Sequence, residues 1–283
     1  MTVKTYFTPE SLEEALSLKT QYGYDLHVIA GGTLLMPQIN EGLFFPELVM
    51  GLRSAGMDTV TSNGAGIIGA TATLSQMEEQ TSYPILQEAA RSIGGWAVRN
   101  MATVGGNLFN QPPYGDFCVA LLALDAKVKI QSASSEREVD LNEFLTAGRH
   151  LEADELITEL RIPNHSGQAA FRKFGPRQAS AATIVTVAAQ IDAFDGIVNV
   201  ARIALGGADT TARRSPEAEA VLNNAPFWPV EEKAEALAAQ AAAAAAQASN
   251  PITNAVASEC YRRQMIKVQL KHLLSEMLGS FSA

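Results

Sequence analysis

Apolar positions in the first half of the chain change between strand-like and helix-like spacing, which predicts short strands that alternate with helices. The clearest helix covers residues 8–23, where we expect Thr8 as the N-cap, Pro9 as the first helical residue and Gly23 as the end. Further helices are expected from Pro84 and from Asp116. Further short runs predict strands at residues 3–7, 26–30, 47–52 and 155–163, and the strand at 26–30 is expected to be buried.

From about residue 168 the alternating runs become longer and are followed by helical stretches. Two strands are predicted within 182–208, joined at Asp195-Gly196, because Asp-Gly is a strong signal for a two-residue hairpin turn. The alanine-rich stretch 231–248 is expected as a lightly packed helix, and 257–278 as the last helix. The change of pattern places a domain boundary between 163 and 168, and we predict domains at 1–167 and 168–283.

Composition narrows the possible functions. The 283 residues are 47% hydrophobic and 18% charged, which is typical of a globular protein with a sizeable core. A formal charge of −9 would repel a nucleic-acid backbone or an anionic membrane surface. No apolar run approaches the ~20 residues that span a bilayer, and the N-terminus has no export signal, so we expect a cytoplasmic protein. The two cysteines and four histidines lack metal-ligand spacing, and no metal site is predicted.

Two glycine pairs carry the candidate chemistry. Gly31-Gly32 ends the apolar run "HVIA", and Gly105-Gly106 follows "ATV". Glycines at the end of a strand can present consecutive backbone N–H groups with no Cβ in the way, which suits a pyrophosphate. Each pair alone is more often an ordinary tight turn. Together they could form opposing walls of one ligand groove, although neither is a Rossmann or P-loop motif.

The segments around these glycines resemble a known family. "IAGGTLLMP" and "VRNMATVGGNLFNQPPYGDFCVALLALDA" are similar to the paired FAD-binding signatures of the medium, flavin-carrying subunit of molybdenum hydroxylases, the family of carbon monoxide dehydrogenase and xanthine dehydrogenase. The segments "ELITELRIP", "FRKFGPRQASAATIVTVAAQI" and "YRRQMIKVQLKHLL" resemble later parts of the same subunit, so the resemblance covers nearly the whole chain.

The resemblance implies an α+β fold, with a vanillyl-alcohol-oxidase (PCMH-type) FAD-binding domain of two subdomains, at about 1–55 and 56–167. A smaller α+β C-terminal domain of the CO dehydrogenase flavoprotein type would follow. The resemblance also implies binding roles by position. One side of the pyrophosphate would be lined by Ala30, Gly31, Gly32, Thr33 and Leu34, continued by Leu35, and the other side by Thr103, Gly105, Gly106 and Asn107. The adenosine and ribitol path or the ring system would be contacted by Asn110, Asp116, Leu156 and Ile157, and Lys173 would be the cation close to the flavin.

Two of these positions have alternatives, and a third departs from the family pattern. Lys173 could be a solvated lysine on an alternating strand, and Asp116 could serve as a helix N-cap. Members of the family often carry a polar residue where Leu34 stands, so one side-chain donor to the phosphates is missing here and the backbone must contribute more.

The resemblance also implies partners. Two cysteines cannot hold an iron–sulfur cluster, so the electrons would come from a small subunit with [2Fe–2S] clusters, supplied in turn by a large molybdopterin subunit, with the complex assembled as a dimer of heterotrimers. The chain itself would contribute the flavin, with no catalytic residue beyond it, and would pass electrons to an external acceptor. The alternatives are a stand-alone flavin oxidoreductase and a non-enzymatic nucleotide-binding assembly protein.

Overall fold

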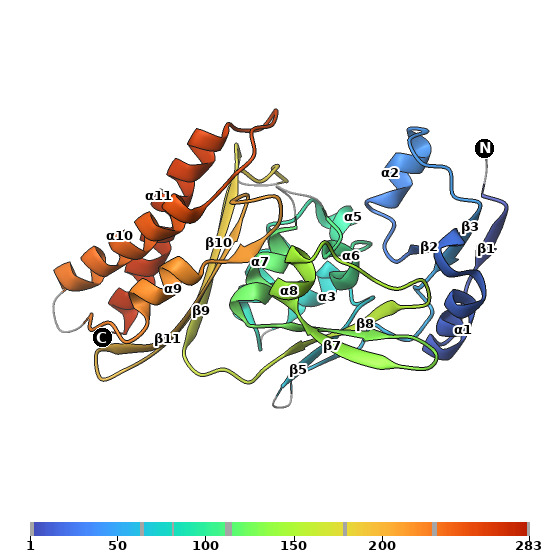
Figure 1. Ribbon diagram of the computed structural model, residues 1–283, viewed down its shortest axis with the longest axis horizontal. Helices are drawn as coiled ribbons and strands as arrows, with labels where there is room; N and C mark the ends of the chain where they lie inside the picture. Colours follow the sequence, from blue (N-terminus) through green and yellow to red (C-terminus); the bar gives the residue numbers. More distant parts are fainter. Residues whose placement is uncertain are drawn as a thin grey trace. The chain divides into compact units, whose positions relative to one another are not determined.

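The computed structural model describes residues 3–62, 65–80, 82–110, 115–177, 180–227 and 231–281. The chain forms two compact units (Figure 1). The N-terminal unit comprises Met1–Glu79, Gly95–Asn110 and Ala126–Pro163, and the C-terminal unit comprises Gln80–Gly94, Gln111–Asp125 and Asn164–Ala283. Two short segments from the first half of the chain therefore belong to the C-terminal unit. The predicted boundary between two sequence-continuous domains at 167/168 stays a prediction.

The N-terminal unit begins with a small parallel sheet in the order β1-β3-β2. Helix α1 packs Ala15 and Leu16 against the apolar side chains of this sheet. A single 3-10 turn, η1, connects α1 to β2, and the short helix α2 follows the first glycine pair. The elements are β1 (Thr5–Phe7), α1 (Leu12–Tyr22), η1 (Gly23–Asp25), β2 (Leu26–Ile29), α2 (Leu35–Asn40) and β3 (Leu48–Gly51).

Helix α1 ends where the sequence predicts but begins later. Gly23 is the C-cap and has a φ of 56°, a conformation that glycine adopts without a Cβ penalty. The predicted N-cap Thr8 is wrong, because Ser11 takes that position and its Oγ accepts from the Glu14 N–H at 3.2 Å. The Glu14 carboxylate accepts in return from the Glu10 N–H at 2.8 Å. The two contacts resemble a capping box, except that Glu14 accepts from the residue before the N-cap, and they satisfy two backbone donors at the start of the helix.

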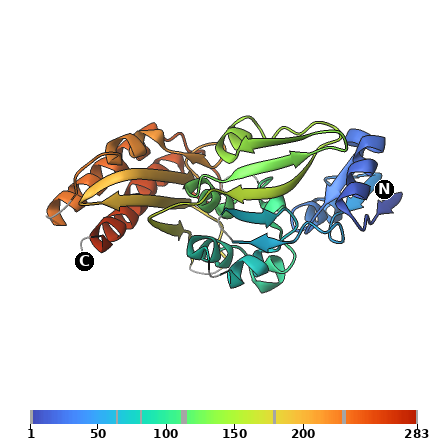
Figure 2. The same ribbon diagram turned by 90° about the horizontal axis from the view of Figure 1, so that it is seen from below.

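The second sheet of the N-terminal unit is antiparallel, with the order β4-β5-β8-β6-β7. Its longer strands run side by side in green in Figure 2. Four short helices complete the unit. The elements are β4 (Val60–Thr61), β5 (Gly66–Gly69), α3 (Leu74–Glu79), α5 (Trp96–Arg99), α6 (Val104–Asn107), β6 (Lys127–Gln131), β7 (Glu136–Asp140), α8 (Leu141–Thr146) and β8 (Leu156–Ile162).

The C-terminal unit contains a four-stranded antiparallel sheet in the order β12-β11-β10-β9. Helices α10 and α11 lie on one side of the sheet and α7 on the other (Figure 1). The predicted hairpin is confirmed, since Asp195 and Gly196 join β10 to β11 with φ angles of 50° and 72°. The elements are α4 (Pro84–Arg91), α7 (Asp116–Ala123), β9 (Gln168–Phe174), β10 (Val185–Phe194), β11 (Ile197–Gly206), β12 (Arg213–Arg214), α9 (Pro216–Leu222), α10 (Glu231–Ala248) and α11 (Glu259–Ser280).

Strand β10 separates two chemical environments. Val185, Val187 and Ile191 join the apolar core shared with α10 and α11, whereas Thr186 points to the opposite face, where it contacts α7. The alanine-rich stretch is the predicted helix α10, but the expectation of light packing is wrong. Its inward alanines are fully buried against α11 and α9, because small side chains allow helices to approach closely. Within the described part of the chain, none of the helices is both long and apolar enough to cross a membrane.

Candidate functional site

The first glycine pair lies in a loop with free backbone donors. Strand β2 stops at Ile29, and α2 does not begin until Leu35. Among the described residues, no hydrogen bond uses the N–H groups of Gly31, Gly32, Thr33 or Leu34. Gly32 has a φ of 70°, which turns the chain away from the strand direction. Consecutive free N–H groups in such a turn form a concave site for an anion.

The first glycine loop packs directly on the segment before the second glycine pair. A Cβ on Gly31 would lie 1.8 Å from the Met101 carbonyl oxygen and 3.0 Å from the Ala102 Cα. Only glycine fits at this position. The two loops that the sequence predicts as walls of one groove are therefore brought together within the N-terminal unit. A cavity of about 30 Å³ lies beside the contact, lined by Ala30, Gly31, Arg53, Thr71, Thr73, Asn100, Met101 and Thr103.

The second glycine pair is used differently from the first. The Gly105 N–H donates to the Ala70 carbonyl at 2.8 Å, and the Gly106 N–H donates to Thr103 Oγ1 at 3.1 Å. The Asn107 N–H donates to the Thr103 carbonyl at 2.9 Å. A Cβ on Gly105 would lie 2.8 Å from the Ala70 oxygen. Close packing against the 70–72 segment thus explains Gly105, and the backbone donors of this pair are already engaged.

Only Thr103 of the predicted second wall lines the cavity. Its hydroxyl is the N-cap of α6, so its position is held by the helix that follows. Leu34 is 39% exposed and offers no side-chain donor, and Leu35 is the first residue of α2. Asn110, whose N–H donates to the Asn107 carbonyl at 3.1 Å, is the last described residue before 111–114. The roles of these residues in FAD binding stay predictions.

Sequence reasoning did not identify Arg53 and Thr71. Arg53 follows β3 by two residues, and β3 is the parallel neighbour of β2. The carboxyl ends of parallel strands lie at a common edge of the sheet, and this brings Arg53 near the first glycine loop. The position of Arg53 directly after a predicted strand is therefore the sequence feature that could have identified it. Thr71 comes shortly after β5 in the second sheet, and no local pattern distinguishes it from a core threonine.

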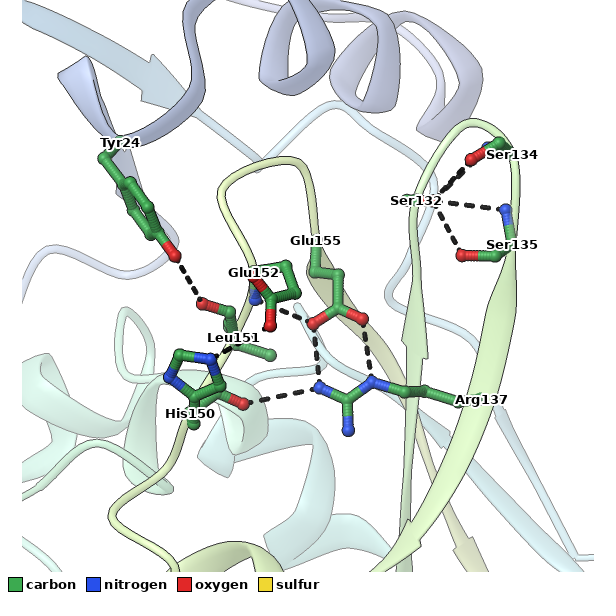
Figure 3. Close-up of polar contacts among 9 residues, drawn as sticks. All are labelled: Tyr24, Ser132, Ser134, Ser135, Arg137, His150, Leu151, Glu152 and Glu155. Atoms are coloured by element: carbon green, nitrogen blue, oxygen red, sulfur yellow. Dashed lines mark hydrogen bonds and ion pairs between the residues drawn. The ribbon is translucent and has the colours of Figure 1, made fainter.

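Leu156 and Ile157 begin β8 and are buried, with 3% and 6% of their surface exposed. Leu156 packs in the apolar cluster around α1 and β3. The chain just before it is held by an ion pair on which several polar contacts converge (Figure 3). Arg137 Nε lies 2.7 Å from Glu155 Oε1, and Arg137 Nη2 lies 2.8 Å from Glu155 Oε2.

Further contacts in Figure 3 fix the same turn. The Glu152 N–H donates to Glu155 Oε2 at 2.8 Å, and the hydroxyl of Tyr24 donates to the Leu151 carbonyl at 3.4 Å. The hydrogen bonds from Arg137 hold the pKa of Glu155 below its usual value, although burial opposes the shift. The start of β8 is therefore set by electrostatics, and its two apolar residues are set by packing.

Asp116 and Lys173 meet in the C-terminal unit. Asp116 is the first residue of α7, with Gly115 rather than Asp116 as the N-cap, so the N-cap alternative for Asp116 is wrong. Its Oδ2 lies 2.8 Å from Lys173 Nζ, and the Thr183 hydroxyl donates to both carboxylate oxygens at 2.9 and 2.8 Å. The Thr186 hydroxyl donates to Oδ1 as well.

Lys173 is not a solvated lysine, because only 13% of its side chain is exposed. In addition to its ion pair with Asp116, the Lys173 ammonium group donates to the carbonyl of Ser92 at 2.9 Å. Ser92 is the residue that follows α4. Strand β9, helix α7 and the end of α4 are thereby joined through one charge pair. A buried charge is costly unless it is paired and hydrogen-bonded, and here Asp116 and the Ser92 carbonyl hold the Lys173 ammonium group in one position.

Two family descriptions match the sequence of this chain. Residues 2–165 match the family described as "FAD binding domain in molybdopterin dehydrogenase", and residues 169–277 match "CO dehydrogenase flavoprotein C-terminal domain". Two curated relatives are similar over almost their whole length. The 6-hydroxypseudooxynicotine dehydrogenase complex subunit alpha of Paenarthrobacter nicotinovorans is 34% identical, covering 96% of this chain and 94% of the relative. The putative xanthine dehydrogenase FAD-binding subunit of Escherichia coli K12 is 29% identical, covering 98% and 96%.

Solved structures agree with these matches. CO dehydrogenase from Oligotropha carboxidovorans contains a chain with a TM-score of 0.85 and 26% identity, covering 97% of both chains. Quinoline 2-oxidoreductase from Pseudomonas putida 86 has the same fold, with a TM-score of 0.88, 24% identity and coverage of 99% and 98%. The expected fold class, an FAD-binding domain followed by a CO dehydrogenase flavoprotein C-terminal domain, is confirmed. The chain belongs to the family of FAD-binding medium subunits of molybdenum hydroxylases.

Proposed function

We propose that this chain is the FAD-carrying electron-transfer subunit of a multi-subunit molybdenum-dependent dehydrogenase or hydroxylase. The observation that carries the proposal is the first glycine loop, whose N–H groups at Gly31–Leu34 are free next to a contact that admits only glycine. The loop lies within residues 2–165, which match the family described as "FAD binding domain in molybdopterin dehydrogenase". When bound, FAD supplies the capacity to accept electrons one at a time and to release two.

The residues present fit this cofactor. The Gly31 position is a cradle that a Cβ would fill, and the free N–H groups are the donors that a diphosphate requires. We assign Ala30, Gly31, Gly32, Thr33, Leu34, Leu35 and Thr103 to the diphosphate side. Gly105, Gly106 and Asn107 are assigned to the same site. Gly105 holds the Thr103 segment against Ala70, and the N–H groups of Gly106 and Asn107 donate to Thr103.

The other predicted contacts belong to the rest of the cofactor. Asn110, Asp116, Leu156 and Ile157 are assigned to the adenosine, ribitol and ring contacts. Lys173 is assigned to the edge of the flavin, where a cation stabilises the negative charge of the reduced ring. What supports the assignment is that Lys173 is buried and held in one position by Asp116.

The proposed partners follow from what the chain lacks and from its relatives. Two cysteines cannot supply the thiolates of an iron–sulfur cluster. One relative is named as a subunit of a dehydrogenase complex and another as the medium subunit of nicotine 6-hydroxylase. We propose an iron–sulfur small subunit and a molybdopterin large subunit as partners, assembled as a dimer of heterotrimers in the cytoplasm.

The test is cofactor binding followed by reconstitution. Purified full-length chain is stripped of flavin and titrated with FAD, and saturable binding with flavin absorbance bands is expected. Electron transfer to FAD is then expected only when both partner subunits are added with a substrate of the large subunit. A chain that never binds FAD would contradict the proposal. Turnover with a soluble donor in the absence of partners would instead support a stand-alone oxidoreductase.

A further inference from the structure

The cavity beside the first glycine loop contains a buried hydroxyl group that the fold does not use. Thr71 is 6% exposed, and its Oγ1 has no hydrogen-bond partner within the part of the chain that the structure describes. The backbone of Thr71 is already held, because its N–H donates to the Met57 carbonyl at 3.0 Å. A buried hydroxyl without a partner costs stability, so its presence at a ligand cavity indicates a partner that arrives with the ligand.

The same cavity is bordered by Arg53. Among the described residues, its guanidinium has no carboxylate partner and its Nη1 lies 3.8 Å from Met101 Sδ. Three other arginines of the N-terminal unit pair with carboxylates: Arg99 with Glu78, Arg137 with Glu155 and Arg161 with Glu138 and Glu159. Arg149 donates to the Leu108 carbonyl at 2.6 Å. The chain has a formal charge of −9. A guanidinium group that lies beside free N–H groups and is not paired with a carboxylate is suited to bind an anion from outside the chain.

Three separate segments thus direct donors to one place. Gly31 of the loop after β2, Arg53 of the segment after β3 and Thr71 of the segment after β5 all line this cavity, and among the described residues the Gly31 N–H has no hydrogen-bond acceptor. The cavity of about 30 Å³ has room for a group of the size of one oxygen or one water. Leu34 has no side-chain donor, so a side-chain hydrogen bond that adds to those of the loop backbone comes from another residue.

We infer that Arg53 and Thr71 are two further side-chain ligands of the FAD diphosphate, with one phosphoryl oxygen seated in the cavity toward Thr71 and the charge balanced by Arg53. This inference rests on the proposed function and adds two binding residues to it. Arg53 makes a charge-assisted, two-donor contact of the kind that guanidinium groups form with phosphates. Thr71 donates the single hydrogen bond that its hydroxyl leaves unused.

The experiment compares the affinities of four variants of the full-length, flavin-free chain for FAD, ADP and riboflavin. R53Q and T71V remove the two donors, whereas R53K and T71S retain part or all of them. R161Q is the control, because it removes an arginine from β8 of the same unit that does not line the cavity. Binding of FAD is followed by quenching of flavin fluorescence, and ADP is measured by competition with FAD.

We expect R53Q and T71V each to weaken FAD and ADP binding about tenfold or more. Riboflavin, which has no phosphate, should bind the variants as it binds the parent chain. T71S and R161Q should stay within about twofold of the parent, and R53K should fall between R53Q and the parent. T71V should also be at least as resistant to urea as the parent without FAD, because valine replaces a hydroxyl that has no partner. Misfolding therefore cannot imitate the expected loss.

Two results would overturn the inference. One is an unchanged affinity for FAD in both R53Q and T71V, which would leave the proposed function intact. The other is an equal weakening of FAD and riboflavin, which would place the effect away from the diphosphate. If the parent chain does not bind FAD at all, the proposed function fails together with the inference, so the two failures are distinguishable.

Discussion

The ion pair between Asp116 and Lys173 permits a quantitative test by a double-mutant cycle. Asp116→Asn and Lys173→Met keep the approximate size of each side chain and remove its charge. Each single variant leaves the partner charge buried, with side-chain exposures of 5% for Asp116 and 13% for Lys173. Loss of one member of a buried pair costs about 3–5 kcal/mol. We expect a loss of stability at the lower end of this range. In Lys173→Met the Thr183 hydroxyl still donates to Asp116, and in Asp116→Asn the Ser92 carbonyl still accepts from Lys173.

The double variant separates the pair from its surroundings. With both charges removed, no charge remains buried alone, so its cost should be well below the sum of the two single costs. A coupling free energy of about 2 kcal/mol is expected between the two sites. The assay is urea unfolding of the flavin-free chain, followed by circular dichroism, at constant pH and salt. The absence of FAD ensures that any role of Lys173 at the cofactor does not contribute.

A matched control lies next along the same strand. Arg172 Nη2 is 2.7 Å from Glu276 Oε1, but the Glu276 side chain is 66% exposed. The same cycle with R172M and E276Q should give a coupling below about 1 kcal/mol, because exposed ion pairs are screened by solvent. Additive effects for Asp116 and Lys173, within about 0.5 kcal/mol, would refute the reasoning that the pair holds β9, α7 and α4 together.

Three further predictions concern other parts of the site. Gly31→Ala should destabilise the flavin-free chain by about 1–3 kcal/mol or more in the urea assay and should weaken FAD binding, because its Cβ would meet the Met101 carbonyl. Gly279→Ala is the control. A Cβ at that position in α11 meets open space, so this variant should be neutral or slightly stabilising in the same assay. Arg137 lowers the pKa of Glu155 from 4.5, so the stability from this pair is full above about pH 4.5 and is lost as the pH falls through the lowered pKa. Urea midpoints measured from pH 6 to pH 3 should therefore fall less steeply for R137Q than for the parent, and equal slopes would contradict this assignment. Lys173→Met should lower the midpoint potential of bound FAD in a redox titration, and an unchanged potential would remove its proposed role at the flavin.

Local patterns in the sequence predict much of the fold because they depend on residues that are close along the chain. The Asp195-Gly196 hairpin and the Gly23 cap need only a positive φ at defined positions, which Gly and Asp accept. The true N-cap of α1 was also readable, since Ser11 and Glu14 have the spacing of a capping box. The family resemblance located the first glycine loop for the same reason, because its motif is continuous in sequence.

Contacts between distant segments were decided only by the tertiary structure. Arg53 and Thr71 reach the glycine loop because parallel β2 and β3 end at one edge and because β5 brings its following residues to the same cavity. The pairing of Lys173 with Asp116 depends on the way α7 packs against β9 and β10. The sequence alone determined which residues can form a turn, a cap or an anion-binding loop. Which charges and hydroxyl groups are left unpaired is a property of packing, because it depends on every neighbour that the fold brings within hydrogen-bond distance.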